Sequence, residues 1–198
     1  MLHQIKFNME QKRIGNYLIE VDYDNHPQSP REYDNISTMI CFHKRYDLGD
    51  KHNYKSDDYD GWEEVKEAIM NDYKVLMIKP LYLFDHSGIT ISTSPFGCQW
   101  DSGRIGWVFI EEKNWIKMMG EDMDRSEERL ERIIDGDVET YDKYLTGEVY
   151  QYKIYEVETC SLGHEHKSLV ESCGGYFGEE ECRSEGQDVL DNLVLQVV

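Results

Sequence analysis

The chain has 198 residues, and its 40 acidic side chains outnumber 21 basic ones, which gives a formal net charge of −19. Hydrophobic residues make up 39% and aromatic residues 12%, a composition that excludes a disordered acidic tail and is sufficient for a folded core. So negative a surface repels nucleic acid and anionic membranes and attracts basic protein surfaces. We therefore expect no direct binding of nucleic acid or of a membrane.

The N-terminal residues 1–13 carry charges throughout and show no apolar core of a signal peptide. No run in the sequence approaches the roughly 18 apolar residues of a membrane span. Five cysteines, an odd number, fit a reducing cytosol better than a disulfide framework. These features predict a protein of the cytoplasm.

Hydrophobic periodicity predicts paired strands in the first half of the chain. Apolar residues spaced at i, i+3 and i+7 after Asp60 indicate the first helix. The nearly continuous apolar run that follows reads as a buried strand, and Pro80 within it predicts a bulge or bend. The elements expected up to this point are strands at 2–7, 16–24, 37–43 and 74–84, and a helix at 60–71.

The second half begins with two further strands and continues with two helices, the second of which carries an apolar stripe interrupted by Gly136. The clearest strand of the chain comes next, and the C-terminal end closes as a helix or a strand. The strands are expected at 88–94, 104–110 and 148–160, and the helices at 111–119 and 126–145.

Strands in adjacent pairs, with helices grouped near the middle and the end, indicate an α+β fold. We expect a single domain with a mainly antiparallel sheet of about five to seven strands and three to four helices. The domain is expected to span residues 1–178, and residues 179–198 are expected to form an acidic C-terminal segment that packs on it or extends from it.

The negative charge is concentrated in two segments. Residues 111–142 contain twelve acids and five bases, a net charge of −7, and residues 179–191 contain six acids and one arginine, a net charge of −5. Carboxylates in a row on a helix are spaced a few ångströms apart, as the phosphates of a nucleic acid duplex are. An ordinary solvated helix face has the same pattern of acidic residues. The candidate partner-binding residues are Glu121, Asp122, Asp124, Glu128, Glu131, Asp135, Glu139 and Asp142.

The stretch Asp85-His86-Ser87-Gly88 contains the residue types of a catalytic triad. Neighbouring side chains on a strand point to opposite faces, however, so these adjacent residues cannot converge on one site. We interpret it as a polar turn in which Gly88 adopts a positive φ. A cysteine and histidine nucleophile pair or a metal site is the alternative, because several reactive side chains lie at neighbouring strand ends. These residues are Cys41, His43, His86, Cys98 and Asp101.

A second cluster, Cys160, His164, His166 and Cys173, has ligand types that suit tetrahedral zinc. The spacing lacks the paired CxxC knuckles of a zinc ribbon. A polar hairpin tip with buried cysteines explains the same residues. We therefore expect no cofactor, with a structural zinc at these four residues as the alternative.

Four stretches resemble a family of small acidic proteins from tailed bacteriophages, prophages and mobile elements, most of which are uncharacterised. They are SPREYDNISTMICFHKRYDLGDKH, PLYLFDHSGITISTSPFGCQWDSGRIGWVFI, YDKYLTGEVYQYKIYEVETC and ESCGGYFG, and the resemblance spans roughly residues 16–180. It implies a phage product that acts in the cytoplasm of the bacterial host. It carries no catalytic residues over to this chain.

Charge and resemblance together predict a non-enzymatic accessory protein. It would inhibit a host nucleic-acid-binding defence protein, such as a CRISPR effector or a restriction enzyme, through its acidic surface. One alternative is a small enzyme or metal-binding module that uses the loops around His43, His86, Cys98 and Asp101. Another is a structural or regulatory phage protein that binds a phage partner.

Overall fold

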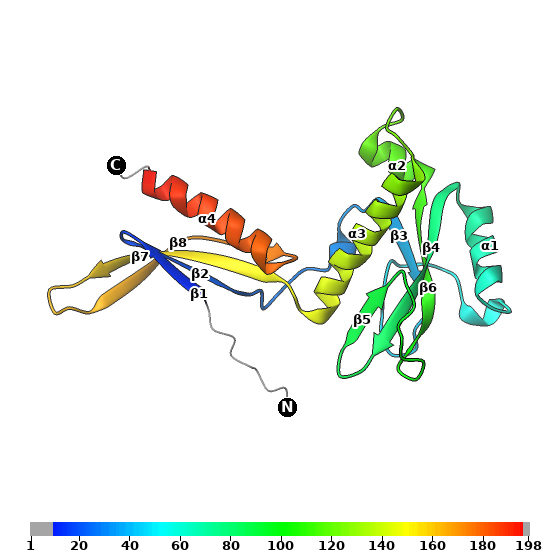
Figure 1. Cartoon of the computed structure of the whole chain (residues 1–198), viewed down its shortest axis with the longest axis horizontal. Coiled ribbons are helices and arrows are strands. Elements are labelled where there is room, and N and C mark those ends of the chain that lie inside the picture. Colours follow the sequence, from blue (N-terminus) through cyan, green and yellow to red (C-terminus); the bar gives the residue numbers. More distant parts are fainter. Residues whose placement is uncertain (1–9, 196–198) are drawn as a thin grey trace. The chain divides into compact units, whose positions relative to one another are not determined.

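The computed structural model describes residues 10–195 and confirms the α+β class (Figure 1). Within these residues there are four α-helices and two antiparallel sheets of four strands each. The contacts divide the chain into two compact units. We call residues 10–28 and 147–195 the terminal unit, and residues 29–146 the central unit. The strand expected at residues 2–7 lies outside the described residues.

The terminal unit is one sheet with one helix on it. The sheet has the order β1-β2-β7-β8, and every neighbouring pair is antiparallel. Its elements are β1 (Glu10–Ile14), β2 (Tyr17–Tyr23), β7 (Tyr150–Thr159), β8 (Glu165–Tyr176) and α4 (Glu179–Leu195). The polar segment after residue 178 is therefore helical from Glu179 to Leu195.

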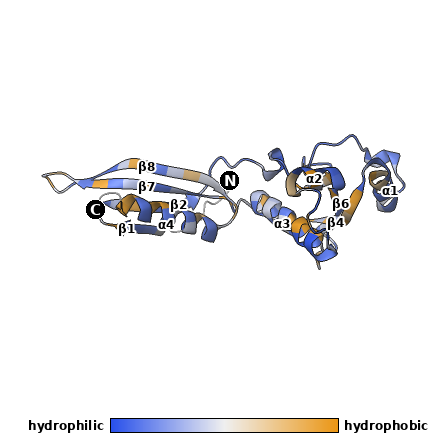
Figure 2. Cartoon of the chain, turned by 90° about the horizontal axis from the view of Figure 1, so that it is seen from above, coloured by the Kyte–Doolittle hydropathy of each residue, from blue (hydrophilic) through white to orange (hydrophobic). Residues whose placement is uncertain are grey.

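Helix α4 packs on the sheet through Cys182, Gly186 and Leu190, which lie on one face at a spacing of four residues. Cys182 and Leu190 join a buried cluster with the β2 and β7 side chains, among them Ile154. Gly186 allows close approach, because a Cβ there would lie 2.8 Å from the Ile19 side chain. Figure 2 shows that the hydrophilic residues of α4 are concentrated in its first half.

The central unit is a sheet with helices on both faces. The strand order is β3-β6-β4-β5, again antiparallel throughout. Its strands are β3 (Ser37–Cys41), β4 (Val75–Asp85), β5 (Ile89–Ser92) and β6 (Ser102–Glu111), and its helices are α1 (Trp62–Asp72), α2 (Glu112–Met119) and α3 (Glu127–Thr146).

Strand β6 supplies core residues to both faces of this sheet. Trp107 and Phe109 pack with α1, whereas Val108 and Ile110 pack with α2 and α3. The register shifts between Leu81 and Tyr82 on β4 and leaves one extra residue, Ile105, on β6. This bulge lies next to Pro80, where the sequence predicts one, and it turns Ile105 toward α3.

The helices and strands expected between residues 16 and 160 lie within two residues of their expected bounds, and α3 continues without a break through Gly136. Strands β1 and β8 are not among the expected elements, because their segments read as turns. One detail of the predicted turn is wrong. The positive φ falls on Ser87, at 61°, and not on Gly88. The turn closes with a hydrogen bond from the His86 N–H to the Gly88 carbonyl, so Ser87 is the residue that must reverse the chain.

The helices of residues 10–195 are all too short or too polar to cross a membrane.

Candidate functional site

Most of the carboxylates expected to form a binding surface on α3 are paired with cations. Lys79 of β4 contacts both Glu131 and Asp135, with N–O distances of 3.0 and 2.8 Å. Glu139 pairs with Lys143 one turn later at 2.8 Å. Glu128 lies 3.9 Å from Arg132. These pairs reduce the net negative charge that the helix presents to a partner.

Two of the expected residues have structural contacts. The Asp142 carboxylate accepts hydrogen bonds from the Thr90 hydroxyl at 2.6 Å and from the Ile91 N–H at 2.7 Å. It therefore ties α3 to β5. Asp124 accepts from the backbone N–H of Ser126 just before α3 begins.

The unpaired carboxylates of this region lie at the corner between α2 and α3. Glu121, Asp122 and Glu127 are exposed, and none of them pairs with a basic side chain among the described residues.

Most carboxylates on helix α4, unlike most of those on α3, are not paired with cations among the described residues. Glu180, Glu181, Glu185 and Asp188 are all exposed and lie on the face opposite the buried residues. We call these four residues the α4 stripe. In the described part of the chain none of them forms an ion pair, since the basic residue of this helix, Arg183, pairs with Glu179 at 3.0 Å. The stripe is thus a row of free negative charges.

The mean charge density of the α4 stripe along the helix axis is close to that of a nucleic acid strand, although its charges are unevenly spaced. From Glu180 to Asp188 the helix rises about 12 Å. Four charges over that length are comparable with one phosphate per roughly 3.4 Å along a single DNA strand.

The loops at the ends of β4 and β6 bring three predicted residues together. The same Asp101 carboxylate oxygen lies 3.2 Å from His86 Nδ1 and 3.7 Å from Cys98 Sγ. A cysteine and histidine nucleophile pair needs the imidazole in contact with the thiol. Here the Asp101 carboxylate contacts both the His86 imidazole and the Cys98 thiol. The thiol therefore faces a carboxylate, which is a weaker base than an imidazole.

The other two residues of that prediction make contacts of their own, although Arg45 and Tyr46, which follow His43, both contact Asp85. His43 accepts from the backbone N–H groups of Arg45 and Tyr46, and its ring stacks on Tyr46. Cys41 is part of β3. Among the described residues, no hydrogen bond or ion pair joins Cys41 or His43 to the other three.

The four expected zinc ligands are also spread out. Cys160 and His164 lie in the turn between β7 and β8, and His166 is opposite Glu158 next to it. Cys173 lies seven residues further along β8, about 20 Å away at the usual rise of a strand. Among the described residues, no three His, Cys, Asp or Glu side chains are grouped to hold a metal ion.

The cysteines differ in their surroundings, and this gives the first testable prediction. Burial raises the pKa of Cys41 and of Cys182 to about 12. Hydrogen bonds from the backbone of Leu162 and His164 lower the pKa of Cys160. A lowered pKa leaves more thiolate at neutral pH, and the thiolate is the reactive form. We expect iodoacetamide at pH 7.5 to modify Cys160 well before Cys41 and Cys182, as measured by peptide mass spectrometry over time.

The same experiment examines the nucleophile alternative. A nucleophile that is activated by a neighbouring base reacts faster than an ordinary exposed thiol. Modification of Cys98 ahead of Cys160 would contradict our interpretation of the loop as a polar turn.

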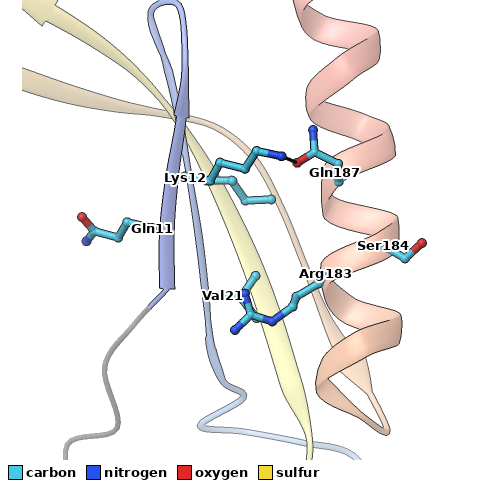
Figure 3. A pocket seen from close by; sticks show the side chains of 7 residues that line it. Gln11, Lys12, Val21, Arg183, Ser184 and Gln187 are labelled. Carbon is cyan, nitrogen blue, oxygen red and sulfur yellow. Dashed lines mark hydrogen bonds between the residues drawn. The ribbon is translucent and has the colours of Figure 1, made fainter.

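A groove of about 480 Å³ lies between β1, β2 and α4 (Figure 3). Ile19 and Val21 form its floor, and Lys12 crosses it to donate a hydrogen bond to the Gln187 side chain at 2.6 Å. Figure 3 shows that Gln11 and Ser184 point away from the groove. The Lys12 side chain thus links β1 to α4.

Sequence reasoning missed one acidic region, which precedes and begins α1. Six carboxylates lie within eleven residues there, beside an aromatic pocket. The signal is the stretch DDYDGWEEVKE, which spans the end of a polar connection and the start of the first expected helix. The carboxylates are Asp57, Asp58, Asp60, Glu63, Glu64 and Glu67.

Comparison with known proteins finds no family model, no curated protein and no solved structure that matches this chain.

Proposed function

We propose that the protein is a binding protein that occupies the basic, nucleic-acid-binding groove of another protein through the α4 stripe. The observation that carries the proposal is the set of four exposed carboxylates without ion pairs on the outer face of α4. The buried face of the same helix is fixed on the sheet through Cys182 and Leu190. The helix backbone that carries the charges is therefore already ordered, which reduces the conformational entropy lost on binding.

The resemblance to phage and prophage proteins suggests the kind of partner. A host defence protein that binds nucleic acid, such as a CRISPR effector or a restriction enzyme, has a groove lined with Lys and Arg side chains. Occupation of that groove would prevent the binding of DNA. The net charge of −19 adds long-range attraction to such a groove.

The test begins with a pull-down from bacterial lysate at low salt, eluted by salt and then by duplex DNA. The captured protein is purified, and its binding to labelled DNA is measured with our protein as competitor. We expect competition with DNA and an inhibition constant that weakens steeply between 50 and 200 mM salt, because salt screens exposed charges. Inhibition that is independent of DNA concentration would contradict groove occupation.

The triple variant Glu181→Gln, Glu185→Gln and Asp188→Asn removes three of the four charges of the α4 stripe. It should weaken inhibition about three- to a hundredfold at 50 mM salt, because each exposed ion pair contributes about 0.2–1 kcal/mol. The fold should be retained, since these side chains contact no other described residue through an ion pair or a hydrogen bond.

The matched control removes three charges from the other unit, at Glu121, Asp122 and Glu127, which are also exposed and unpaired. It should change inhibition by less than about twofold, a change that long-range charge alone can produce. Equal weakening by the two triple variants would show that total charge, and not the α4 stripe, determines binding. Reversal at Asp142 is a poor test of the surface, because that residue holds β5.

A further inference from the structure

A small apolar pocket lies at the beginning of α1 in the central unit. Its volume is about 120 Å³. Gly61, with a φ of +125°, leaves one side open, because a Cβ there would meet nothing within 4 Å. We call it the α1 pocket. Its lining residues are Phe42, Ser56, Tyr59, Gly61, Trp62 and Val65.

The aromatic walls of the α1 pocket are held in place by contacts behind them. Phe42 and Trp62 meet edge to face, with ring centroids 6.0 Å apart. The indole N–H of Trp107 donates to the Trp62 carbonyl at 3.1 Å, and the Arg104 guanidinium lies 3.7 Å from the Trp107 ring centre. The pocket is therefore formed before any partner arrives, which reduces the entropic cost of binding.

Acidic residues precede and follow the lining residues Tyr59, Gly61 and Trp62 along the chain, and we call these carboxylates the rim of the α1 pocket. The six carboxylates between Asp57 and Glu67 are all exposed. The lysine of this stretch, Lys66, lies over the Trp107 ring at 5.4 Å, and Arg104 is 3.7 Å from Glu63. The remaining carboxylates have no basic partner among the described residues, so the rim attracts cations.

An apolar pocket surrounded by like charges has the anatomy of a protein interface, in which a buried anchor is ringed by polar contacts. Cavities of about 150 Å³ hold a benzene molecule. The α1 pocket is somewhat smaller, at about 120 Å³, but it is open beside Gly61, so it can take up one leucine or phenylalanine side chain in part. The charge of the rim requires basic residues on either side of that anchor.

We propose that the α1 pocket binds a short lysine- or arginine-rich segment of another protein and takes up one large apolar side chain of it. This site lies in the central unit and does not depend on the α4 stripe. The apolar anchor gives it a selectivity for sequence that carboxylates alone do not provide. The segment binds as a peptide, so no folded groove is needed on the partner.

The experiment uses the full chain and two fluorescein-labelled peptides, Lys-Lys-Lys-Phe-Lys-Lys-Lys and the same peptide with alanine in place of phenylalanine. Binding is measured by fluorescence anisotropy at 50 mM salt. We expect the phenylalanine peptide to bind at least tenfold more tightly, because burial of a phenylalanine side chain changes an equilibrium constant by about one to two orders of magnitude. Equal affinities would overturn the proposal, because the two peptides have the same charge.

Filling the pocket gives a second readout. Ser56→Trp places an indole at the pocket edge and should reduce the preference for phenylalanine to less than twofold, with the alanine peptide bound as before. Ser168→Trp, at an exposed position of β8, is the matched control and should keep the full preference. A preference that persists in Ser56→Trp would place the anchor elsewhere and overturn the proposal. The comparison of the two peptides on the unaltered chain remains decisive if Ser56→Trp does not fold.

Discussion

Replacement of Gly106 by alanine is expected to destabilise the central unit by more than about 4 kcal/mol, an exceptional loss for a single substitution, because the added methyl group has no room. Gly106 lies on β6 opposite Cys41 of β3. A Cβ there would lie 1.9 Å from the Ile40 carbonyl oxygen and 2.9 Å from its carbonyl carbon. Both are backbone atoms, so no side chain can rotate away.

The surroundings of Gly106 prevent the strands from separating. Strand β6 lies between β3 and β4, so a shift away from β3 presses on β4. Helices cover both faces of this sheet through Phe109 on one side and Val108 on the other. The added methyl group therefore breaks the ladder between β3 and β6 or the packing beside it.

Urea unfolding followed by tryptophan fluorescence measures this effect. The four tryptophans, Trp62, Trp100, Trp107 and Trp115, all belong to the central unit, so their signal reports on that unit. Gly103→Ala is the matched control on the same strand, because a Cβ at Gly103 meets nothing within 4 Å. Equal urea midpoints for the two alanine variants would refute the close approach of the Gly106 backbone to the Ile40 carbonyl group.

Hydrophobic periodicity predicts the elements between residues 16 and 160, whereas it misses β8, whose residues are exposed from Glu165 to Gly175. In α3 the residues Leu130, Ile134 and Val138 recur at four-residue spacing and are all buried. In β7 the alternation of Tyr152 and Ile154 with polar residues places both in the core. Such patterns record which face of an element is buried, and that is a local property.

The division into two sheets depends on partners far apart in sequence. Strand β2 pairs with β7, where Ile19 is opposite Ile154. Nothing in either segment specifies the other, because any apolar strand offers the same backbone hydrogen bonds. The sequence therefore indicated one antiparallel sheet, whereas the described residues form two.

Charge patterns predicted acidic regions but not which acids are free. Asp135 and Asp142 were expected on one exposed face of α3. Lys79 neutralises the first, and the β5 backbone engages the second. Both contacts come from strands more than forty residues earlier. The α1 pocket was missed for the same reason, because Phe42 meets Trp62 only after folding.

Replacement of Asp50 by alanine is expected to destabilise the central unit by about 3–5 kcal/mol, the usual result of removing one partner of a buried ion pair. The Arg31 side chain is only 5% exposed. Its Nε and Nη2 donate to the two carboxylate oxygens of Asp50 at 3.1 and 2.5 Å. The same carboxylate accepts from the Met39 N–H at 2.8 Å. Alanine leaves a buried guanidinium and a backbone donor of β3 with fewer partners.

Two further variants separate the charge from the hydrogen bonds. Asp50→Asn keeps one acceptor oxygen and should lose less stability than Asp50→Ala. The double variant Arg31→Met with Asp50→Ala removes the unpaired charge as well, so it should be more stable than Asp50→Ala alone. Tryptophan fluorescence in urea again gives the free energies. A loss below about 1 kcal/mol in Asp50→Ala, typical of an exposed pair, would mean that water reaches Arg31 and that this ion pair does not hold the segment before β3 in place.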